Sequence, residues 1–505
     1  MLSIFEVCNV KKSSFFKNSF ILTFSNLIIG ILRFIFSIIL SHKLGPEGIG
    51  LYGLIMPIYD LFICLISGGM IAAISKVSAE YFSKKDFKNL NKTIDISMYF
   101  DILWGSFVTI IVFITSTFIG KYVLKDVRSI TAIKVICPAM LFIAISSILK
   151  GYFYGISKVK IPAFIDVFEK TLRIVFLTLI IYIFSLKKIE STVTAAYITL
   201  TIGEFVSTFL LYIAYIIHRK KLNYGYRYEG KAQLLFNVLS ISFPLCLTGF
   251  LTTLLFSFST VLIPRRLLAA GFTYNNALSL MGKFSGMSLN IIFFPMVIID
   301  SISTILIPDL SQTISSKNYW AVENRINQVL RISLLLGLST TIICLTIPQN
   351  LGYLFYKRND LGNYISFVCL LAPFLYLSAT TSGILNGLGK QGIILRNSLI
   401  VALEEILLIF ILVRIPSINI YGVGISFIIT SITELVLNLN IIKDNYFIDI
   451  QKDELIIIIL LSILFLFILN IFKSLLTNGI HKYIIIIIVG FSLYPIYNIL
   501  KQKNK

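Results

Sequence analysis

Apolar runs of about 20 residues recur along the whole chain, and they constrain its fold more than any other feature. Wound as a helix, a run of that length crosses the roughly 30 Å hydrocarbon core of a bilayer. Because the bilayer offers no water to the backbone, each amide must be satisfied within the protein, which a helix achieves. The sequence therefore predicts an all-α, polytopic membrane protein.

The composition agrees with this class. Hydrophobic residues make up 57% of the 505 residues and charged residues 13%, against roughly 25% charged in a soluble domain. The formal net charge is +20, but lysine and arginine stand at the ends of the apolar runs and form no single patch. We therefore expect no nucleic-acid partner. The first run, 19–41, is too long for a secretory signal and lacks a cleavage site, so we expect no removed leader.

We predict fourteen membrane spans, near 19–41, 52–75, 94–118, 131–155, 163–186, 193–217, 236–262, 284–308, 328–348, 363–385, 395–414, 420–442, 455–472 and 482–499. An even number places both termini on the same side. Basic residues such as Lys84, Lys85, Arg219 and Lys231 concentrate in the loops that would then be cytoplasmic. We expect a multi-pass protein of the bacterial cell membrane with both termini in the cytoplasm.

Two sequence patterns indicate an internal repeat. Cys137-Pro138 followed by Lys150-Gly151 is echoed by Ala372-Pro373 followed by Asn386-Gly387. Pro57 and Asp60 are echoed by Pro295 and Asp300. Spans in corresponding places have the same orientation, so the repeat is predicted to be parallel. We expect a six-helix bundle over 1–225, a second over 226–445, and two additional helices with a cytoplasmic tail over 446–505.

Charged residues inside the spans are the main functional candidates. A charge at mid-bilayer costs roughly 2.5–3.5 kcal/mol on insertion scales, so it usually faces a partner or a wet cavity. The fifth span opens with four charges on one helical stripe, because their spacing is three or four residues. They form either a salt bridge between Glu169 and Arg173 that only holds helices together, or one wall of a central cavity. The charges are Asp166, Glu169, Lys170 and Arg173 on that stripe, and Arg33, Asp60, Glu204, Asp300, Glu404, Glu405 and Glu434 elsewhere.

Arg265 and Arg266 close the seventh span and allow two interpretations. They are either side chains that reach toward the membrane interface or a clamp for a diphosphate, whose oxygens match guanidinium groups. Asp60 and Asp300 likewise either pack helices together or bind a coupling cation. The three histidines and six cysteines are scattered, so we expect no metal site and no cofactor.

Enzymatic signatures are absent from the sequence. It contains no GxSxG, HExxH, Walker A or EF-hand pattern. Every connection between spans is short, which leaves no room for an inserted soluble catalytic domain. Spans, repeat and intramembrane charges together favour a transporter over an enzyme.

The motif Gly45-Pro46-Glu47-Gly48-Ile49-Gly50-Leu51-Tyr52 resembles the stage V sporulation protein B family, as do 150–155, Gly203-Glu204 and 264–267. The resemblance covers about residues 15 to 445. It implies membership of the multidrug/oligosaccharidyl-lipid/polysaccharide exporter superfamily. Such proteins look like two six-helix bundles around a cationic cavity, with two added helices lining a groove for a lipid tail. They are thought to move undecaprenyl-diphosphate sugars by alternating access, and the sporulation branch is implicated in spore cortex peptidoglycan.

The resemblance implies two groups of site residues. The expected cationic, substrate-binding group is Arg33, Lys150, Arg173, Arg265 and Arg266, and the ion-pair or coupling candidates are Asp60, Asp166, Glu169, Glu204 and Asp300. The chain departs from the family in its first span, where Gly30 and Ser37 stand in place of arginines. Arg33 lies between them on the same helical face, so we interpret it as a relocated charge. Lys150 stands where the family prefers arginine.

We therefore expect a flippase for a lipid-linked saccharide, with a lipid II-like peptidoglycan precursor as the leading substrate. Its partners would be that substrate, membrane lipids and a coupling cation. A cation-coupled exporter of drugs or small molecules is the first alternative, and it should have an acidic, aromatic cavity. A membrane acyl- or glycosyltransferase is the second. The saccharide, the energy source and the oligomeric state are left open by the sequence.

Overall fold

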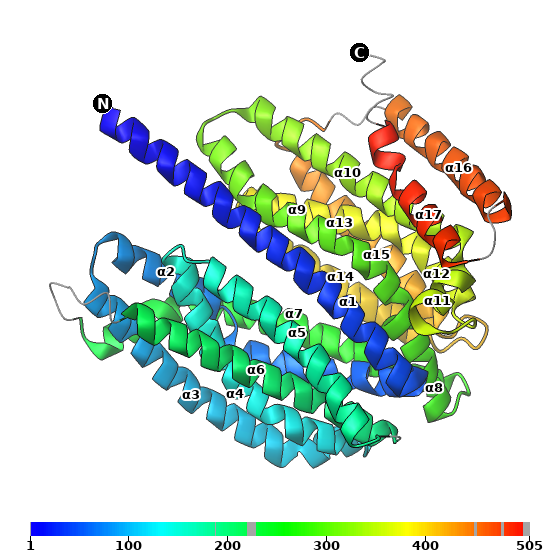
Figure 1. Cartoon of the computed structure of the whole chain (residues 1–505), viewed down its shortest axis with the longest axis horizontal. Helices are drawn as coiled ribbons and strands as arrows, with labels where there is room; N and C mark the ends of the chain where they lie inside the picture. The colour runs from blue at the N-terminus through cyan, green and yellow to red at the C-terminus, as the bar shows by residue number, and fades with distance from the viewer. Residues whose placement is uncertain (1, 187, 220–228, 449–451, 476–478, 498–505) are drawn as a thin grey trace. The chain divides into compact units, whose positions relative to one another are not determined.

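The computed structural model describes residues 2–186, 188–219, 229–448, 452–475 and 479–497. Within these ranges all regular secondary structure is helical, which confirms the all-α prediction (Figure 1). The α-helices are α1 (Leu2–Ser67), α2 (Met70–Ser83), α3 (Phe87–Phe118), α4 (Ser129–Gly155), α5 (Lys160–Ile183), α6 (Ile189–Arg219), α7 (Lys231–Ala269), α8 (Tyr274–Met281), α9 (Leu289–Ser315), α10 (Tyr319–Thr346), α11 (Pro348–Tyr356), α12 (Gly362–Val368), α13 (Ala372–Gly387), α14 (Gln391–Leu412), α15 (Tyr421–Lys443), α16 (Lys452–Leu475) and α17 (Ile480–Phe491).

All fourteen predicted spans fall on helices wherever the structure describes them. Ten helical segments of the described ranges are long and apolar enough to cross a membrane, and the first, Phe20–Ser83, holds two predicted spans. The remaining three predicted spans are α5, α14 and α17. The first two carry several charges, and α17 has only 12 residues. The chain is a multi-pass membrane protein.

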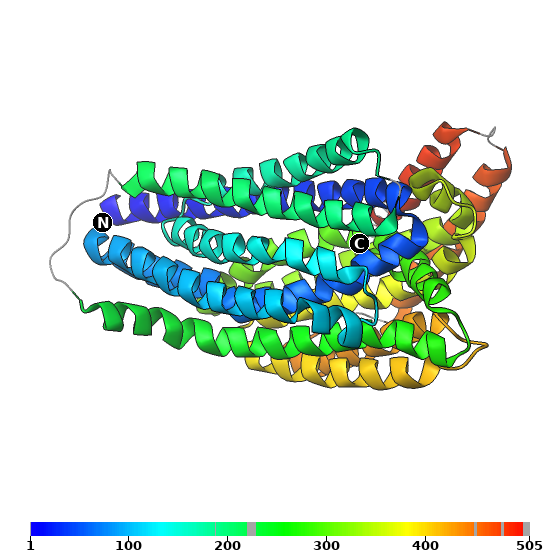
Figure 2. The same cartoon turned by 90° about the horizontal axis from the view of Figure 1, so that it is seen from below.

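The chain divides into two compact units. Unit 1 comprises Met1–Leu44 and Leu51–Val261, and unit 2 comprises Gly45–Gly50 and Leu262–Lys505. In unit 1, α4 packs against α2, α3 and α6, and α5 packs against α6. In unit 2, α13 packs against α9, α10 and α15, while α16 and α17 contact α10. Figure 2 shows α14 and α15, in yellow and orange, side by side.

The predicted organisation of six, six and two helices stays a prediction. Its first boundary, between residues 225 and 226, lies outside the described residues, as does the end of the expected cytoplasmic tail, 498–505.

The second predicted span, 52–75, is not one helix. Helix α1 ends at Ser67, and α2 begins after Gly69, whose φ of 73° lies in the left-handed region. Glycine adopts that conformation without steric cost. A Cβ on Gly69 would also lie 2.6 Å from Leu245 Cβ of α7, so the break is closely packed.

The two units share the same local construction. Lys85 in unit 1 and Lys317 in unit 2 both have φ of 57° and are followed by the N-cap residues of α3 and α10. In each unit the cap side chain accepts a hydrogen bond from an amide three residues later, Asp86 from Asn89 and Asn318 from Ala321. This capping satisfies amides that a helix leaves unpaired at its start. Residues of the two units that are separated by the same number of positions as Lys85 and Lys317 are therefore equivalent, and this separation is the register of the repeat.

Helix contacts repeat in the same register. A Cβ on Gly105 would lie 3.3 Å from Leu141 Cδ2, and a Cβ on Gly337 would lie 2.6 Å from Pro373 Cα. Gly337 follows Gly105, and Pro373 follows Leu141, by the same step that separates Lys317 from Lys85. The predicted register, which paired Pro138 with Pro373, is therefore wrong by about one turn. Short apolar motifs slip by one turn without leaving their helical face, which explains the error.

The corrected register also separates the two aspartates that the sequence paired. In the corrected register Asp300 is equivalent to Gly68, and Asp60 is equivalent to Ile292. Asp60 and Asp300 do not occupy equivalent positions, so the repeat gives no reason to assign them a common role.

Candidate functional site

A network of buried charges in unit 1 is the candidate site. Helix α5 presents its charged stripe to α4 and α6 because residues three and four apart share a face. Helix α6 contributes Glu204, and α4 contributes Lys150 near its C-terminal end. The structure thus brings together five of the predicted site residues and Lys170, which the sequence placed on the charged stripe.

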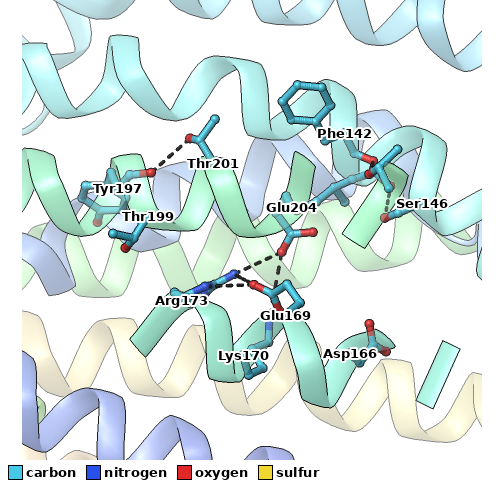
Figure 3. Close-up of polar contacts among 12 residues, drawn as sticks. Phe142, Ser146, Asp166, Glu169, Lys170, Arg173, Tyr197, Thr199, Thr201 and Glu204 are labelled. Atoms are coloured by element: carbon cyan, nitrogen blue, oxygen red, sulfur yellow. Dashed lines mark hydrogen bonds and ion pairs between the residues drawn. The ribbon is translucent and has the colours of Figure 1, made fainter. Parts of the chain in front are cut away.

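Arg173 lies at the centre of this network (Figure 3). Its Nη2 is 2.7 Å from Glu169 Oε1 and 3.2 Å from Glu204 Oε1, and its Nε donates to the same Glu169 oxygen at 3.0 Å. Lys170 Nζ lies 2.5 Å from the other Glu169 oxygen and 3.9 Å from Glu204 Oε1. Glu169 is 2% exposed and Glu204 8%, so each buried carboxylate has two cationic partners.

Gly203 makes room for this arrangement. A Cβ at that position would lie 2.5 Å from Glu169 Oε1. A larger residue would push the carboxylate away from Arg173. The Gly203-Glu204 pair therefore has a packing reason as well as a charge.

A second ion pair joins α4 to the start of the charged stripe. Lys150 Nζ is 2.7 Å from Asp166 Oδ1, and both side chains are about one-fifth exposed. With this pair the network contains three basic and three acidic side chains, so its formal charge is zero. The two cations of this network that were expected to bind substrate, Lys150 and Arg173, are both paired with carboxylates in this structure.

Tyrosines border the network, and the sequence did not single them out. The rings of Tyr52 and Tyr197 are stacked with centroids 5.0 Å apart, and Tyr197 OH donates to Tyr52 O at 2.8 Å. The buried hydroxyl of Tyr59 has no hydrogen-bond partner among the described residues and lies within electrostatic range of Glu204 and Arg173. A tyrosine in an apolar span looks like an ordinary core residue, so only the fold identifies it here.

Two other predicted residues of unit 1 lie on α1. Arg33 and Asp60 are both exposed, and the charge of Arg33 acts on the Asp60 carboxyl. No hydrogen bond or ion pair of the described residues ties either of them to Arg173. The structure therefore gives Arg33 an acidic neighbour and leaves its proposed role as a substrate ligand untested.

The predicted residues of unit 2 have different surroundings. The guanidinium of Arg266 lies 3.5 Å from the centroid of the Phe410 ring, and its Nε donates to Phe410 O at 2.9 Å. Arg266 is thus held against α14 by a cation–π contact and a hydrogen bond. Arg265 is partly buried, and Asp300 is exposed on α9.

Unit 2 does not reproduce the ion network of unit 1. At the equivalent positions in the corrected register, Lys150, Arg173 and Glu204 are replaced by Ser382, Glu405 and Val436. Unit 2 instead has acidic groups bound by hydroxyls, since Ser382 donates to Glu434 at 2.9 Å and Thr433 donates to Glu404 at 3.1 Å.

Outside the spans, Asp360 is the acidic group with the clearest perturbation. Hydrogen bonds from Arg358, 2.7 and 2.8 Å long, together with Lys283 at 2.8 Å, lower its pKa to about 2. The ionised carboxylate therefore fixes the connection between α11 and α12.

Comparison with known proteins identifies a family and relatives for this chain. Residues 15–314 match the family model described as polysaccharide biosynthesis protein. Stage V sporulation protein B of Bacillus subtilis (strain 168) is 26% identical over 423 residues, which is 83% of this chain and 81% of the relative. Lipid II flippase MurJ of the same organism is 23% identical over 410 residues, covering 75% of this chain and 74% of the relative.

Solved structures show the same fold. A lipid II flippase MurJ in an inward closed conformation superposes with a TM-score of 0.72 at 17% identity, covering 96% of this chain and 99% of that one. An inward-facing multidrug resistance MATE transporter of the MOP superfamily superposes with a TM-score of 0.66 at 15% identity, covering 84% and 97%.

These findings confirm the predicted resemblance and a protein of the flippase and transporter class, not an enzyme. The family model spans more than half of the chain, from the first membrane span into α9. The chain belongs to the polysaccharide biosynthesis protein family.

Proposed function

We propose that this protein is a flippase that moves an undecaprenyl-diphosphate-linked saccharide across the bacterial cell membrane by alternating access. The observation that carries the proposal is the buried network around Arg173, within a fold shared with a lipid II flippase. Buried charges inside spans are costly, and they usually mark a substrate or ion path. A lipid II-like peptidoglycan precursor is the leading substrate, and the similarity to stage V sporulation protein B favours a use during sporulation.

The network offers a way to bind a diphosphate without leaving an unpaired charge. Arg173, Lys170 and Lys150 now contact carboxylates. Phosphate oxygens form the same charge-assisted hydrogen bonds with these groups. A bound diphosphate would replace Glu204 or Asp166 as a partner, because these carboxylates are more exposed than Glu169. Binding would thus exchange partners around an Arg173–Glu169 pair that stays in place.

Arg265 and Arg266 belong to the proposed cationic group, but their surroundings separate them. Because Arg266 is held by Phe410, we assign it to packing and Arg265 to the head group. Arg265→Gln should weaken binding of a lipid diphosphate, as read by native mass spectrometry. Arg266→Gln should leave binding intact and lower thermal stability. Equal loss of binding in both variants would contradict this division.

The second candidate is a cation-coupled exporter of drugs or small molecules. Three carboxylates and three neighbouring tyrosines are the features that favour it. Such a site would attract a cationic, aromatic ligand.

One experiment separates the two candidates. Purified protein in liposomes that contain labelled lipid II is treated with a reagent confined to one leaflet. The flippase predicts that labelled lipid moves between leaflets with wild type and moves more slowly with Lys170→Gln. Movement equal to that in protein-free liposomes, together with accumulation of a cationic dye, would favour the exporter.

A further inference from the structure

Asp101 is a buried acid that lies outside the ion network. It is near the middle of α3, its exposed fraction is 0%, and neither carboxylate oxygen has a hydrogen-bond partner among the described residues. No charged side chain of that part of the chain acts on it, and burial is its only perturbation. An isolated ionised carboxylate in such a place is so unfavourable that the group takes up a proton instead.

The surrounding contacts place Asp101 at the helix break between α1 and α2. Trp104 Nε1 donates to Leu65 O at 3.2 Å, and a Cβ on Gly105 would lie 3.2 Å from Ile66 Cγ2. Asp101 lies one turn before Gly105 on the same face. Because α3 runs antiparallel to α2, Asp101 lies at the same height along the helices as the break between α1 and α2. The start of α2 has no side-chain cap there.

Helix α7 completes the surroundings of the acid. Cys246 Sγ is 3.2 Å from Cys64 O at the end of α1, and Cys246 lies within electrostatic range of both Asp101 and the Cys64 thiol. These two thiols are the titratable groups that α7 and α1 place at the break. Helices α2 and α4 contribute no charged side chain that acts on the acid.

Unit 2 provides an internal comparison. The position equivalent to Asp101 in the corrected register is Ser333, and its hydroxyl lies 2.5 Å from Thr380 Oγ1. The unit 1 counterpart of Thr380 is Ile148, which has no polar atom to offer. Helix α9 also runs unbroken through Ser301, the counterpart of Gly69. The broken helix and the unpartnered acid therefore occur together in unit 1, and neither is found at the equivalent positions of unit 2.

We propose that Asp101 is a proton-binding site at the break between α1 and α2. A proton removes the charge of the carboxyl by itself, whereas hard cations such as calcium or magnesium are held by about six or more oxygens. Within one turn of Asp101 on the same face of α3, the hydroxyl of Ser97 also has no hydrogen-bond partner among the described residues. The proton exchanges with water only when the packing of α1, α2 and α3 opens. The site thus links proton uptake to a change in conformation, and it does not depend on which substrate is moved.

Infrared difference spectroscopy of the full-length protein in lipid at neutral pH tests this proposal. The carbonyl band of a protonated carboxylic acid should be present in wild type and absent in Asp101→Asn. It should persist in Asp360→Asn, which removes an ionised acid. Ile148→Thr supplies the hydroxyl found in unit 2, so it should shift the band without removing it. This variant keeps the test open if Asp101→Asn fails to fold.

Two results would overturn the proposal. The first is an acid band that neither Asp101→Asn nor Ile148→Thr alters, because Asp101 would then be ionised. The second is a rise in thermal stability with sodium, relative to choline, that disappears in Asp101→Asn. That result would identify a metal cation as the ligand. Neither readout uses transport, so failure here is distinct from failure of the proposed flippase.

Discussion

Glu169 is the most deeply buried carboxylate of the ion network, and it depends on Arg173 and Lys170. Arg173→Ala would leave Glu169 with one cation and Glu204 with only the distant Lys170. Breaking a buried pair in this way costs about 3–5 kcal/mol. We expect a clear drop in the thermal unfolding midpoint in detergent.

Charge reversal provides the control for this prediction. Exchanging the charges, Glu169→Arg with Arg173→Glu, restores the pair but sets the new carboxylate against Glu204. The exchange should therefore recover part of the lost stability, and adding Glu204→Gln should recover more. If the triple variant is no better than Arg173→Ala, the contacts with Glu169 and Glu204 contribute little.

Asp360 gives the protein a pH dependence of known sign. Its pKa is lowered from 3.8 to about 2 by Arg358 and Lys283, so the folded state favours the ionised form. The resulting stability is present above pH 3.8 and is lost as the pH falls toward 2. The carboxylate is 41% exposed, so the effect is small. Unfolding midpoints measured from pH 5 downward should fall less in Asp360→Asn than in Asp444→Asn, which changes an exposed acid at the end of α15. Identical curves would contradict the assignment.

Sequence reasoning found most of the ion network but not all of its neighbourhood. Asp166, Glu169, Lys170, Arg173 and Glu204 were predicted because charges inside spans are rare. Lys150 was predicted from the family resemblance. Asp101 obeys the same rule, since it lies inside the predicted span 94–118, and it was overlooked. The sequence could not predict that Asp101 lacks a partner, because this depends on how four helices pack together.

At the scale of elements, the kinked part of α1 packs closely on α8 and on the residue that follows it. The segment Gly45–Gly50 belongs to unit 2, where a Cβ on Gly282 would lie 1.8 Å from Pro46 O and one on Gly50 would lie 2.1 Å from Leu278 O. Gly282→Ala must therefore push the two backbones apart, at a cost of about 1–3 kcal/mol. We expect a lower unfolding midpoint and less protein in the membrane.

Gly53→Ala is the matched control for this substitution. Gly53 lies on α1, one turn after Gly50, and a Cβ there would meet nothing within 4 Å. This variant should be as stable as wild type or slightly more so, because alanine favours a helix over glycine. Equal damage in both variants would show that close packing is not the reason for Gly282.

The helices themselves were predictable because spans follow from apolar length alone. Their interruptions were not. Gly68 and Gly69 lie within an apolar run, where a glycine pair looks the same whether it packs helices or breaks one. The repeat was also visible, but its register was not, since matches such as Cys137-Pro138 are too short to exclude a slip of one turn.

At the scale of the whole molecule, fourteen spans with cytoplasmic termini make a direct topological prediction. Lys84, in the connection between α2 and α3, should be cytoplasmic, and Asn359, between α11 and α12, should be external. Both side chains are exposed, and changing them to cysteine spares the Arg358–Asp360 pair. In intact cells a membrane-impermeant thiol reagent should label Asn359→Cys but not Lys84→Cys. Labelling of both, or of neither, would contradict the topology.

The central claim is that the chain moves a lipid-linked saccharide, and leaflet-resolved accessibility of lipid II in proteoliposomes tests it most directly. The wild-type protein should let an impermeant reagent reach lipid II that began in the inner leaflet. Lys170→Gln, which keeps the Arg173–Glu169 pair, should reduce that transfer, while Gly53→Ala should leave it unchanged. Transfer by Lys170→Gln at the wild-type rate would remove the ion network from the mechanism. No transfer by folded wild-type protein, beyond that in empty liposomes, would contradict the assignment of lipid II as the substrate.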